Sequence, residues 1–360
     1  MKIKILLFVI FISITQLIAQ SNLDSNKVEY SFYPMVFYTP ETQFAFGAGG
    51  IAYYRLGPNK KLPPSKIVFS AYYTTNNQYL LSVSPALYFA GSAKIRSESK
   101  LDFRKEVSRF YGIGNNSSEI INPEYKIGLF KFHTELSLQT GMIKNLYFGF
   151  IYEFTKSNII NLLENPILNN QNILGKKSGI ISGFGSLLVL DYRNNVFFPT
   201  ENIYAKLKMI FMSKEFGSDF TFNRLILDFR KYQNLGYENI IASQIYIESS
   251  SGDIPFFMLP ALGGSERMRG YFLGRYMDEV FFTWQVEYRK IIWNRIGAVA
   301  FLGMGDVANK FNQFNVVQLK YNYGFGLRYV FDEKEKLNVR MDLGFGNNTS
   351  GIYFALEEAF

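Results

Sequence analysis

The sequence contains no cysteine, and its 360 residues include one histidine, His133, and two tryptophans. Without cysteine the chain cannot form a disulfide scaffold, a zinc–thiolate centre or an iron–sulfur cluster. A single histidine also excludes a histidine-rich metal site, so we expect neither a metal nor a cofactor. Beyond residue 20 no run of 18 apolar residues occurs, and a membrane-spanning helix is therefore not expected there.

Aromatic residues and glycine, by contrast, are abundant. The aromatic content is 18%, with 36 Phe and 25 Tyr, and there are 29 Gly. An apolar content of 48% lets the chain bury enough surface to exclude a disordered protein. The mean hydropathy of -0.01 excludes a bundle of membrane helices. The composition therefore predicts a β protein rich in Tyr, Phe and Gly.

The first twenty residues resemble an export signal. Lys2 and Lys4 precede an apolar run over residues 5–14, and a small residue, Ala19, follows. This arrangement is typical of a secretory signal peptide, whereas an N-terminal membrane anchor would need about 20 apolar residues. We predict a signal peptide at 1–20, cleaved after Ala19 or Gln20.

The rest of the chain alternates apolar and polar residues. Residues 320–331 show the pattern best, with Tyr321, Tyr323, Phe325, Leu327, Tyr329 and Phe331 on one face and Asn322, Gly324, Gly326 and Arg328 on the other. Similar alternation occurs in 130–139, 146–155 and 337–345. A period of two predicts strands, because successive side chains point to opposite faces of a sheet.

Soluble β-sandwiches also alternate, but these apolar faces are unusually aromatic and continuous, and the opposite faces carry Lys, Arg, Glu and Asp. Apolar outside and polar inside is the pattern of outer-membrane barrels, and a bilayer permits no open sheet edge. We therefore predict an all-β fold: a closed antiparallel transmembrane β-barrel in a single domain, 21–360.

The alternation divides the chain into sixteen predicted strands, an even number as bacterial barrels require. They are 31–38, 43–56, 65–76, 78–90, 94–105, 125–140, 143–157, 178–192, 201–213, 219–233, 237–250, 278–290, 295–307, 320–331, 336–346 and 351–360. A count of fourteen remains open if 78–90 and 94–105 are not strands. With the N-terminus in the periplasm, the long connections 106–124, 158–177, 251–277 and 308–319 face outward, as is typical of these barrels.

One long connection carries a recognisable motif. Residues 262–275 read LGGSERMRGYFLGR, after the eleventh predicted strand and before the twelfth. Four other segments, 32–50, 109–115, 190–200 and 323–332, together with the ending ALEEAF, also resemble the BamA/TamA superfamily of outer-membrane assembly and translocation barrels, also called bacterial surface antigens.

The resemblance implies that this loop folds back into the barrel lumen. Its tip would be Arg269, Gly270 and Tyr271, after the turn glycines Gly263 and Gly264. In the family the arginine pairs with acidic groups on the inner wall, and Glu287 matches one of these positions. The second acidic position is occupied here by Gly303, and Asp306 lies an odd number of residues further on, toward the other face. We expect a loop latch with one firm partner, Glu287.

The C-terminal strand resembles a barrel-assembly signal. Ile352, Phe354, Leu356 and Phe360 are predicted to share its apolar face, as in the strand by which outer-membrane barrels are delivered to the assembly machinery. An exposed strand of this kind suits β-augmentation.

The resemblance implies a function in inserting, translocating or displaying proteins at the outer membrane. Family members receive client chains through periplasmic domains ahead of the barrel. We expect this sequence to lack such domains, because only residues 21–30, approximately, lie between the predicted signal peptide and the first predicted strand. A passive or gated pore, or a scaffold subunit for a surface complex, is the alternative. Expected partners are the assembly machinery, client outer-membrane proteins, and anionic lipid or lipopolysaccharide, which would attract a chain of net charge +8.

Neither an enzyme nor a nucleic-acid-binding protein is expected. The sequence has no GxSxG motif, and its GxG pairs lack the third glycine of a dinucleotide-binding loop. His133, the single imidazole, lies on a predicted lumen-facing strand between Lys131 and Glu135, where a structural role is expected. Asp102 and Asp342 have no spacing that marks an acid–base pair, and no nucleic-acid-binding motif is recognisable.

Overall fold

The computed structural model describes residues 28–39, 43–54, 64–90, 94–117, 119–121, 123–141, 143–333 and 336–360. The predicted signal peptide at 1–20 lies outside the described residues.

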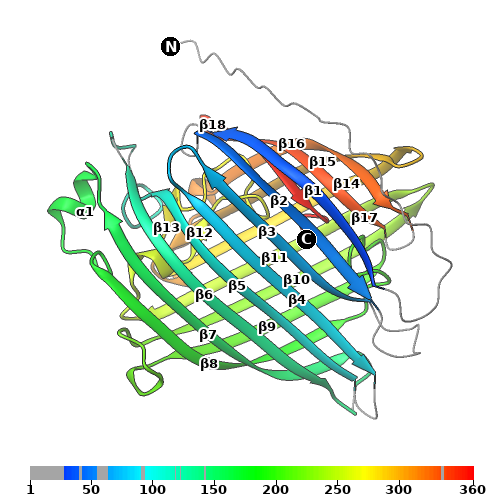
Figure 1. The fold of residues 1–360 in the computed structure, drawn as a ribbon, viewed down its shortest axis with the longest axis horizontal. Coiled ribbons are helices and arrows are strands. Elements are labelled where there is room, and N and C mark those ends of the chain that lie inside the picture. The colour runs from blue at the N-terminus through cyan, green and yellow to red at the C-terminus, as the bar shows by residue number, and fades with distance from the viewer. Residues whose placement is uncertain are drawn as a thin grey trace.

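Sixteen strands form one antiparallel sheet in which each strand pairs with its neighbours along the chain (Figure 1). They are β1 (Glu29–Thr39), β2 (Gln43–Tyr54), β3 (Ser65–Thr74), β4 (Tyr79–Ala90), β5 (Lys94–Arg109), β6 (Glu124–Gln139), β7 (Leu146–Asn161), β8 (Ser178–Asp191), β9 (Asn202–Met212), β10 (Phe222–Gly236), β11 (Asn239–Gly252), β14 (Val280–Trp293), β15 (Ile296–Ala308), β16 (Lys320–Asp332), β17 (Leu337–Gly346) and β18 (Thr349–Leu356). The predicted count of sixteen is confirmed. The count of fourteen is wrong, because β4 and β5 pair with each other and with β3 and β6.

Small elements decorate the connections. A two-stranded ribbon, β12 (Ala261–Leu262) with β13 (Tyr276–Met277), lies within the long connection between β11 and β14 and was not predicted. The helices are α1 (Pro166–Asn170) and the 3-10 turns η1 (Lys214–Phe216), η2 (Phe256–Met258), η3 (Phe311–Gln313) and η4 (Val316–Gln318). Among the described residues, no helix has the length and apolar character needed to cross a membrane.

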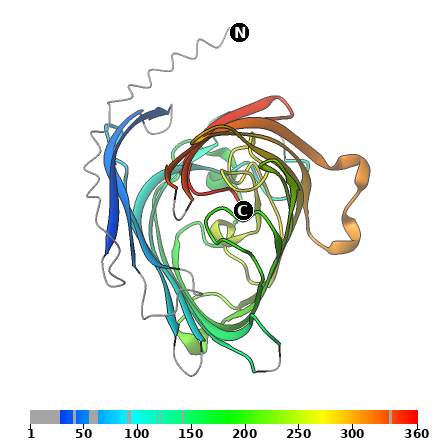
Figure 2. The same cartoon turned by 90° about the vertical axis from the view of Figure 1, so that its right-hand side faces the viewer.

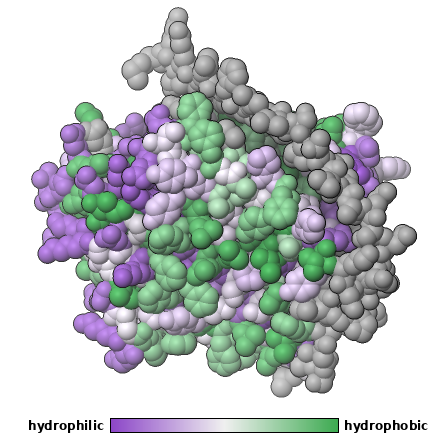
Figure 3. Space-filling model, viewed as in Figure 1, coloured by the Kyte–Doolittle hydropathy of each residue, from purple (hydrophilic) through white to green (hydrophobic). Residues whose placement is uncertain are grey.

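The alternation of the sequence is reproduced in the burial of side chains. On β16, Tyr321, Tyr323 and Phe325 are exposed on the outer surface, whereas Asn322 and Arg328 are buried inside. Figure 3 shows green and pale side chains across the wall over β4–β8, while purple side chains gather at the end that carries α1. An apolar exterior around a polar interior is the distribution expected of a barrel in lipid.

The predicted alternation fails where β16 meets β17, and Phe331, also predicted to face outward, packs against a buried cluster inside. Leu337 was predicted to face outward with its neighbours on β17, but it is only 1% exposed and packs against Phe197. The ladder between β16 and β17 shifts register between Val330 and Asp332, so that Asp332 pairs with Leu337. The irregularity changes the side-chain alternation at the start of β17.

The connections divide the barrel into two ends. We call the end with the turns 237–238 and 294–295 the short-turn end, and the end with the connections 110–123, 162–177 and 253–279 the long-loop end. The predicted asymmetry between short and long connections is therefore present in the structure.

The sheet does not close through its backbone in the described residues. β1 and β18 are its two edges, with no ladder between them, and Figure 2 shows β18 and the C-terminus turned toward the interior, away from β1. The expectation of a continuous ladder is therefore not met in the described residues. The chain also leaves the wall after Leu356: Glu357 has a φ of 63°, and Glu358 binds Arg328 and Asn338 inside the barrel.

This inward turn also corrects the predicted C-terminal face. Ile352 and Phe354 are exposed on the outer surface, at 40% and 49%, but Leu356 is half-buried and Phe360 is only 4% exposed. Phe360 belongs to the apolar cluster of the lumen. The four residues therefore do not share one lipid-facing surface.

The fold predicts heat-modifiable migration on a detergent gel. A sheet of sixteen strands satisfies most of its backbone hydrogen bonds internally and should resist detergent at room temperature. The unboiled protein should migrate differently from the boiled protein. Identical migration of the two samples would contradict the barrel architecture.

Candidate functional site

The connection between β11 and β14 enters the lumen, and the tip of this loop carries a buried arginine. Arg269 has a fully buried side chain. Its Nη1 donates to Asp342 Oδ2 at 2.7 Å, and its Nη2 pairs with Glu287. The guanidinium also lies 3.6 Å from the centroid of the Phe301 ring. Both acidic partners and the aromatic ring belong to the inner wall, so the loop tip is docked through a cation.

The expectation of one acidic partner for Arg269 was wrong. Glu287 on β14 is one partner, and Asp342 on β17 is the second. Gly303 provides no carboxylate, and Asp342 supplies one from a different strand. Asp306 serves elsewhere: its carboxylate lies 2.9 Å from Lys320 Nζ and accepts a hydrogen bond from Asn115.

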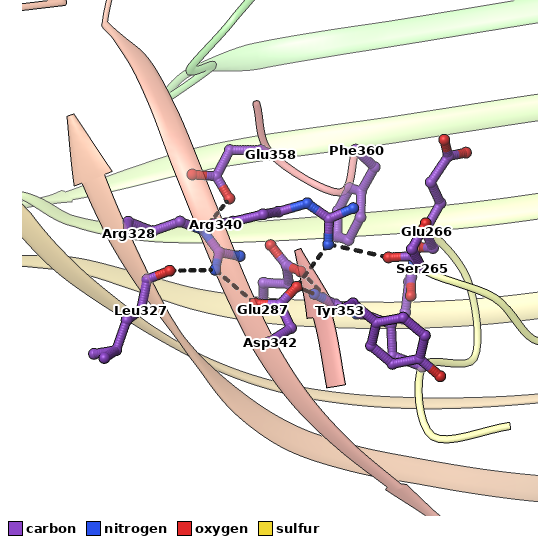
Figure 4. Close-up of polar contacts among 12 residues, drawn as sticks. Ser265, Glu266, Glu287, Leu327, Arg328, Arg340, Asp342, Tyr353, Glu358 and Phe360 are labelled. Atoms are coloured by element: carbon purple, nitrogen blue, oxygen red, sulfur yellow. Dashed lines mark hydrogen bonds and ion pairs between the residues drawn. The ribbon is translucent and has the colours of Figure 1, made fainter. Parts of the chain in front are cut away.

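Asp342 is the centre of a larger buried network (Figure 4). In addition to Arg269, its carboxylate accepts hydrogen bonds from Arg328 Nη1 and Arg340 Nη1, each at 2.6 Å. Charge-assisted hydrogen bonds of this kind are the stronger class. Because three guanidinium groups depend on it, loss of this one carboxylate would leave three cations with fewer counter-charges.

A second branch of the network reaches the C-terminal segment. Glu287 binds Arg289 at 2.8 Å as well as Arg269, and Arg289 Nη2 donates to the carbonyl of Phe360 at 2.9 Å. Glu358 accepts from Arg328 at 2.8 Å. The acidic partners of the loop therefore also organise the residues that follow β18.

The loop tip contacts the backbone of β17 directly. Gly270 has a φ of 111°, and a Cβ there would lie 2.6 Å from the carbonyl carbon of Phe345. A Cβ on Gly344 would lie 2.7 Å from the carbonyl carbon of Arg269. Glycine is required at both positions because the two backbones approach too closely for any side chain.

The loop tip also binds β18, the edge strand. Tyr353 Oη accepts a hydrogen bond from Gly270 N at 2.9 Å, and Thr349 Oγ1 donates to the Gly270 carbonyl at 2.9 Å. Tyr271, only 1% exposed, accepts from Asn347 N at 2.9 Å and donates to the Tyr321 carbonyl at 3.1 Å. The tip thus fastens the last two strands from inside.

Gly263 and Gly264 lie where the loop begins its inward course. Both adopt positive φ angles, 113° and 100°, as a turn glycine can. Two further contacts tie this stretch to the wall: Arg340 Nη1 donates to the Ser265 carbonyl at 3.0 Å, and Gln285 donates to the Glu266 carbonyl at 2.9 Å.

The long-loop end is filled by apolar side chains from several connections. The ring of Phe256 lies 5.0 Å from that of Phe110 and 5.3 Å from that of Tyr125. Asn165 caps α1 and donates to the carbonyls of Phe110 and Pro123, at 3.0 and 2.7 Å. Three separate connections are therefore locked together over the lumen.

His133 lies on the inner wall among carboxylates. Its Nδ1 is 2.9 Å from Glu153 and its Nε2 is 2.8 Å from Glu135. With an acidic group at each ring nitrogen, neither nitrogen is available to act as the base for a serine nucleophile. The expected structural role of His133 agrees with this position.

Side chains bridge the two edges of the sheet at the short-turn end. Tyr53 on β2 donates to Glu29 at 2.7 Å and contacts Asp332 at the end of β16. Lys66 on β3 pairs with Glu357, which follows β18, and lies 4.7 Å from the centroid of the Phe197 ring. We call these contacts the edge clamp; it joins the first strands to the last without a backbone ladder.

Comparisons with known proteins agree with this architecture. The Omp85 superfamily domain matches residues 64–346. Among solved structures, the chain is similar to BamA from Haemophilus ducreyi lacking POTRA domains 1–3, with a TM-score of 0.58 and 12% identity over 92% of this chain and 70% of that chain. Pseudomonas aeruginosa OccK10 (OpdN) gives a TM-score of 0.34 at 9% identity, over 91% and 96% of the two chains, too low to support an argument. No curated protein matches the chain. At these identities the structural likeness shows a shared fold only.

The geometry predicts that Arg269→Ala destabilises the barrel. Removing one member of a buried ion pair typically costs about 3–5 kcal/mol; we expect about 3 kcal/mol, because Glu287 retains Arg289 and Asp342 retains two arginines. Asp342→Asn should cost more, since it affects three cations. Arg269→Lys should not rescue, because an ammonium cannot span two carboxylates as a planar guanidinium does. Thermal unfolding in detergent measures the differences.

Arg295→Ala is the matched control, because it removes an arginine from an exposed pair with Glu333. It should leave the melting temperature nearly unchanged. The buried network would have no stabilising role if Arg269→Ala melted at the same temperature as Arg295→Ala.

Proposed function

The chain belongs to the Omp85 superfamily, and on that premise we propose that it inserts or translocates other proteins at the outer membrane through the junction between β1 and β18, the seam. The long-loop end would face outward and the short-turn end the periplasm. The barrel would close by pairing β1 with β18 and open by separating them.

The two edge strands, β1 and β18, carry this proposal, because no ladder joins them in the part of the chain that the structure describes. A strand edge presents free N–H and C=O groups that template pairing with another strand. Pro34 on β1 lacks an N–H donor and suits an edge position. A client strand that added to either edge would gain main-chain hydrogen bonds in a medium that offers no water to compete for them.

The latch and the edge clamp would control the seam. The loop tip holds β18 through Tyr353 and Thr349, and the edge clamp joins β3 to Glu357. Both fastenings consist of side-chain contacts, so each can release without breaking a strand ladder. We propose that Arg269, Gly270, Tyr271 and Glu287 act together as a latch on the edge strand.

The alternative of a passive pore receives less support. The lumen contains the docked loop, the C-terminal segment and one apolar cluster that reaches from Phe110 and Phe256 to Phe360. Ion conduction through such an interior would require displacement of these side chains. Among the described residues, no contact specifically favours a role as a scaffold subunit.

Site-specific photo-crosslinking tests the seam. A benzophenone side chain in place of Phe32 on β1, which is 61% exposed, should capture an outer-membrane barrel protein that folds from urea into the same vesicles. The same group at Phe184 on β8, 51% exposed, should not, because β8 has a partner on each side. Equal capture at both positions, or none at either, would exclude the seam as the entry site.

A reversible crosslink, which we call the staple, tests whether the seam must open for capture. Because the chain has no native cysteine, Lys66→Cys and Glu357→Cys can be joined by a reducible thiol crosslinker across the edge clamp. Capture at Phe32 should fall when the staple is in place and return after reduction. Ser70→Cys with Ser82→Cys, which face each other in the β3–β4 ladder, should leave capture unchanged.

Deletion of residues 253–277 tests whether the loop plugs the barrel. In planar bilayers the deleted protein should show large conductance steps, while the parent should show small or rare ones, because the loop fills the lumen. Deletion of 310–318, outside the lumen, is the matched control. Equal conductance of parent and loop-deleted protein, both heat-modifiable, would contradict a plug.

A further inference from the structure

The connection between β15 and β16 leaves the barrel on its outer side. Residues 309–319, which we call the outer arm, contain η3 and η4 and project sideways from the wall, in orange in Figure 2. The arm packs back on the wall through Phe314, whose ring lies 6.2 Å from that of Phe282. Phe282 belongs to the outward-facing residues of β14, so the arm contacts the surface that faces lipid.

The arm exposes large apolar side chains. Val317 is 90% exposed, Val316 is 75% exposed and Phe311 is 54% exposed. The arm leads directly into β16, where Tyr321 and Tyr323 are 57% and 63% exposed, and Phe314 joins it to the apolar wall at Phe282. Isolated exposed apolar residues need no explanation, but a group continuous with a lipid-facing band extends that band.

The length of the neighbouring strands places the arm at the membrane boundary. β14 and β15 have 14 and 13 residues, whereas about 9–11 residues suffice to cross the bilayer core. Counted from the short-turn end, about 9–11 residues reach 283–285 on β14 and 304–306 on β15, a few residues before the arm begins. The arm therefore begins at the level where acyl chains meet headgroups on the long-loop side.

The composition of the arm suits that level. Lys310 is its one charged residue, and its other polar residues are all Asn or Gln. Segments with apolar side chains and a flanking lysine lie at membrane interfaces, where the ammonium reaches anionic headgroups and the apolar groups enter the acyl region.

We propose that the outer arm is a membrane anchor that rests in the outer-leaflet lipid, with Phe311, Val316 and Val317 inserted and Lys310 at the headgroups. It would fix the depth and rotation of the β14–β16 wall relative to the bilayer. This inference depends on the membrane location of the barrel and not on the proposed insertion activity.

Fluorescence quenching in vesicles tests the anchor. The full chain lacks cysteine, so Val317→Cys accepts a single environment-sensitive fluorophore. In phosphatidylcholine vesicles, lipids brominated on the acyl chain should reduce its emission about twofold or more, as for a group buried at the interface, while aqueous iodide should have little effect. Leu273→Cys, at a residue of the lumen loop that is 57% exposed, is the matched control and should be quenched by iodide only.

Two results would overturn the anchor. In one, the label at position 317 is quenched like the label at 273. In the other, it is protected from iodide only in native outer membranes and not in pure lipid, which would point to a protein partner. If Val317→Cys does not give a heat-modifiable barrel, Val316→Cys takes its place, since Val316 belongs to the same exposed pair.

Discussion

The interior of this barrel is organised around a buried cation. Arg269 carries a guanidinium group, and a charge removed from water is costly unless it is paired with good geometry. Asp342 and Glu287 supply that pairing only while the loop tip lies against β17. The close backbone contact between Gly270 and Gly344 follows from the same requirement, since any side chain there would hold the guanidinium away from its partners. The ion pairs therefore hold the loop in place, and glycine at positions 270 and 344 allows the two backbones to approach closely enough for these pairs to form.

The ion pairs around Arg269 also affect β18, the edge strand of the sheet. The residues that position Arg269 also hold the chain after β18: Glu287 shares Arg289 with the Phe360 carbonyl, and Asp342 shares Arg328 with Glu358. The last residues gain these contacts by leaving the wall, so they cannot at the same time extend the β18 ladder toward β1. The buried network and the proposed pairing of β18 with β1 would therefore compete for the C-terminal segment.

Much of this arrangement could be predicted from the sequence. The sixteen strands could be predicted because a strand with one side facing the lumen and one facing lipid alternates polar and apolar residues along the sequence. The lumen-facing position of Glu287 could be predicted because Phe282, Trp284 and Val286 define the opposite, outward face of its strand. Asp342 lies on the polar face of residues 337–345, so its lumen-facing position was predictable, whereas the family resemblance places the second acidic partner at the position of Gly303. The inward turn after Leu356 could not be predicted, since it depends on partners distant in sequence. Leu337 was misplaced because a register shift leaves no local signal.

Among the described residues, side-chain contacts hold the last strand and the segment after it at two places. Near the long-loop end the loop tip binds Tyr353 and Thr349, and at the short-turn end Lys66 binds Glu357. Between these points β18 presents Ile352 and Phe354 outward, and in the described residues its outer edge forms no ladder with β1. In lipid every unpaired N–H and C=O costs several kcal/mol, so an open stretch of edge is stable only when another strand pairs with it. If β1 fills that role at rest, an incoming strand competes on nearly equal terms, because it replaces the same hydrogen bonds. The side-chain fastenings then decide how readily the exchange begins, and they can do so without contributing to the ladder itself.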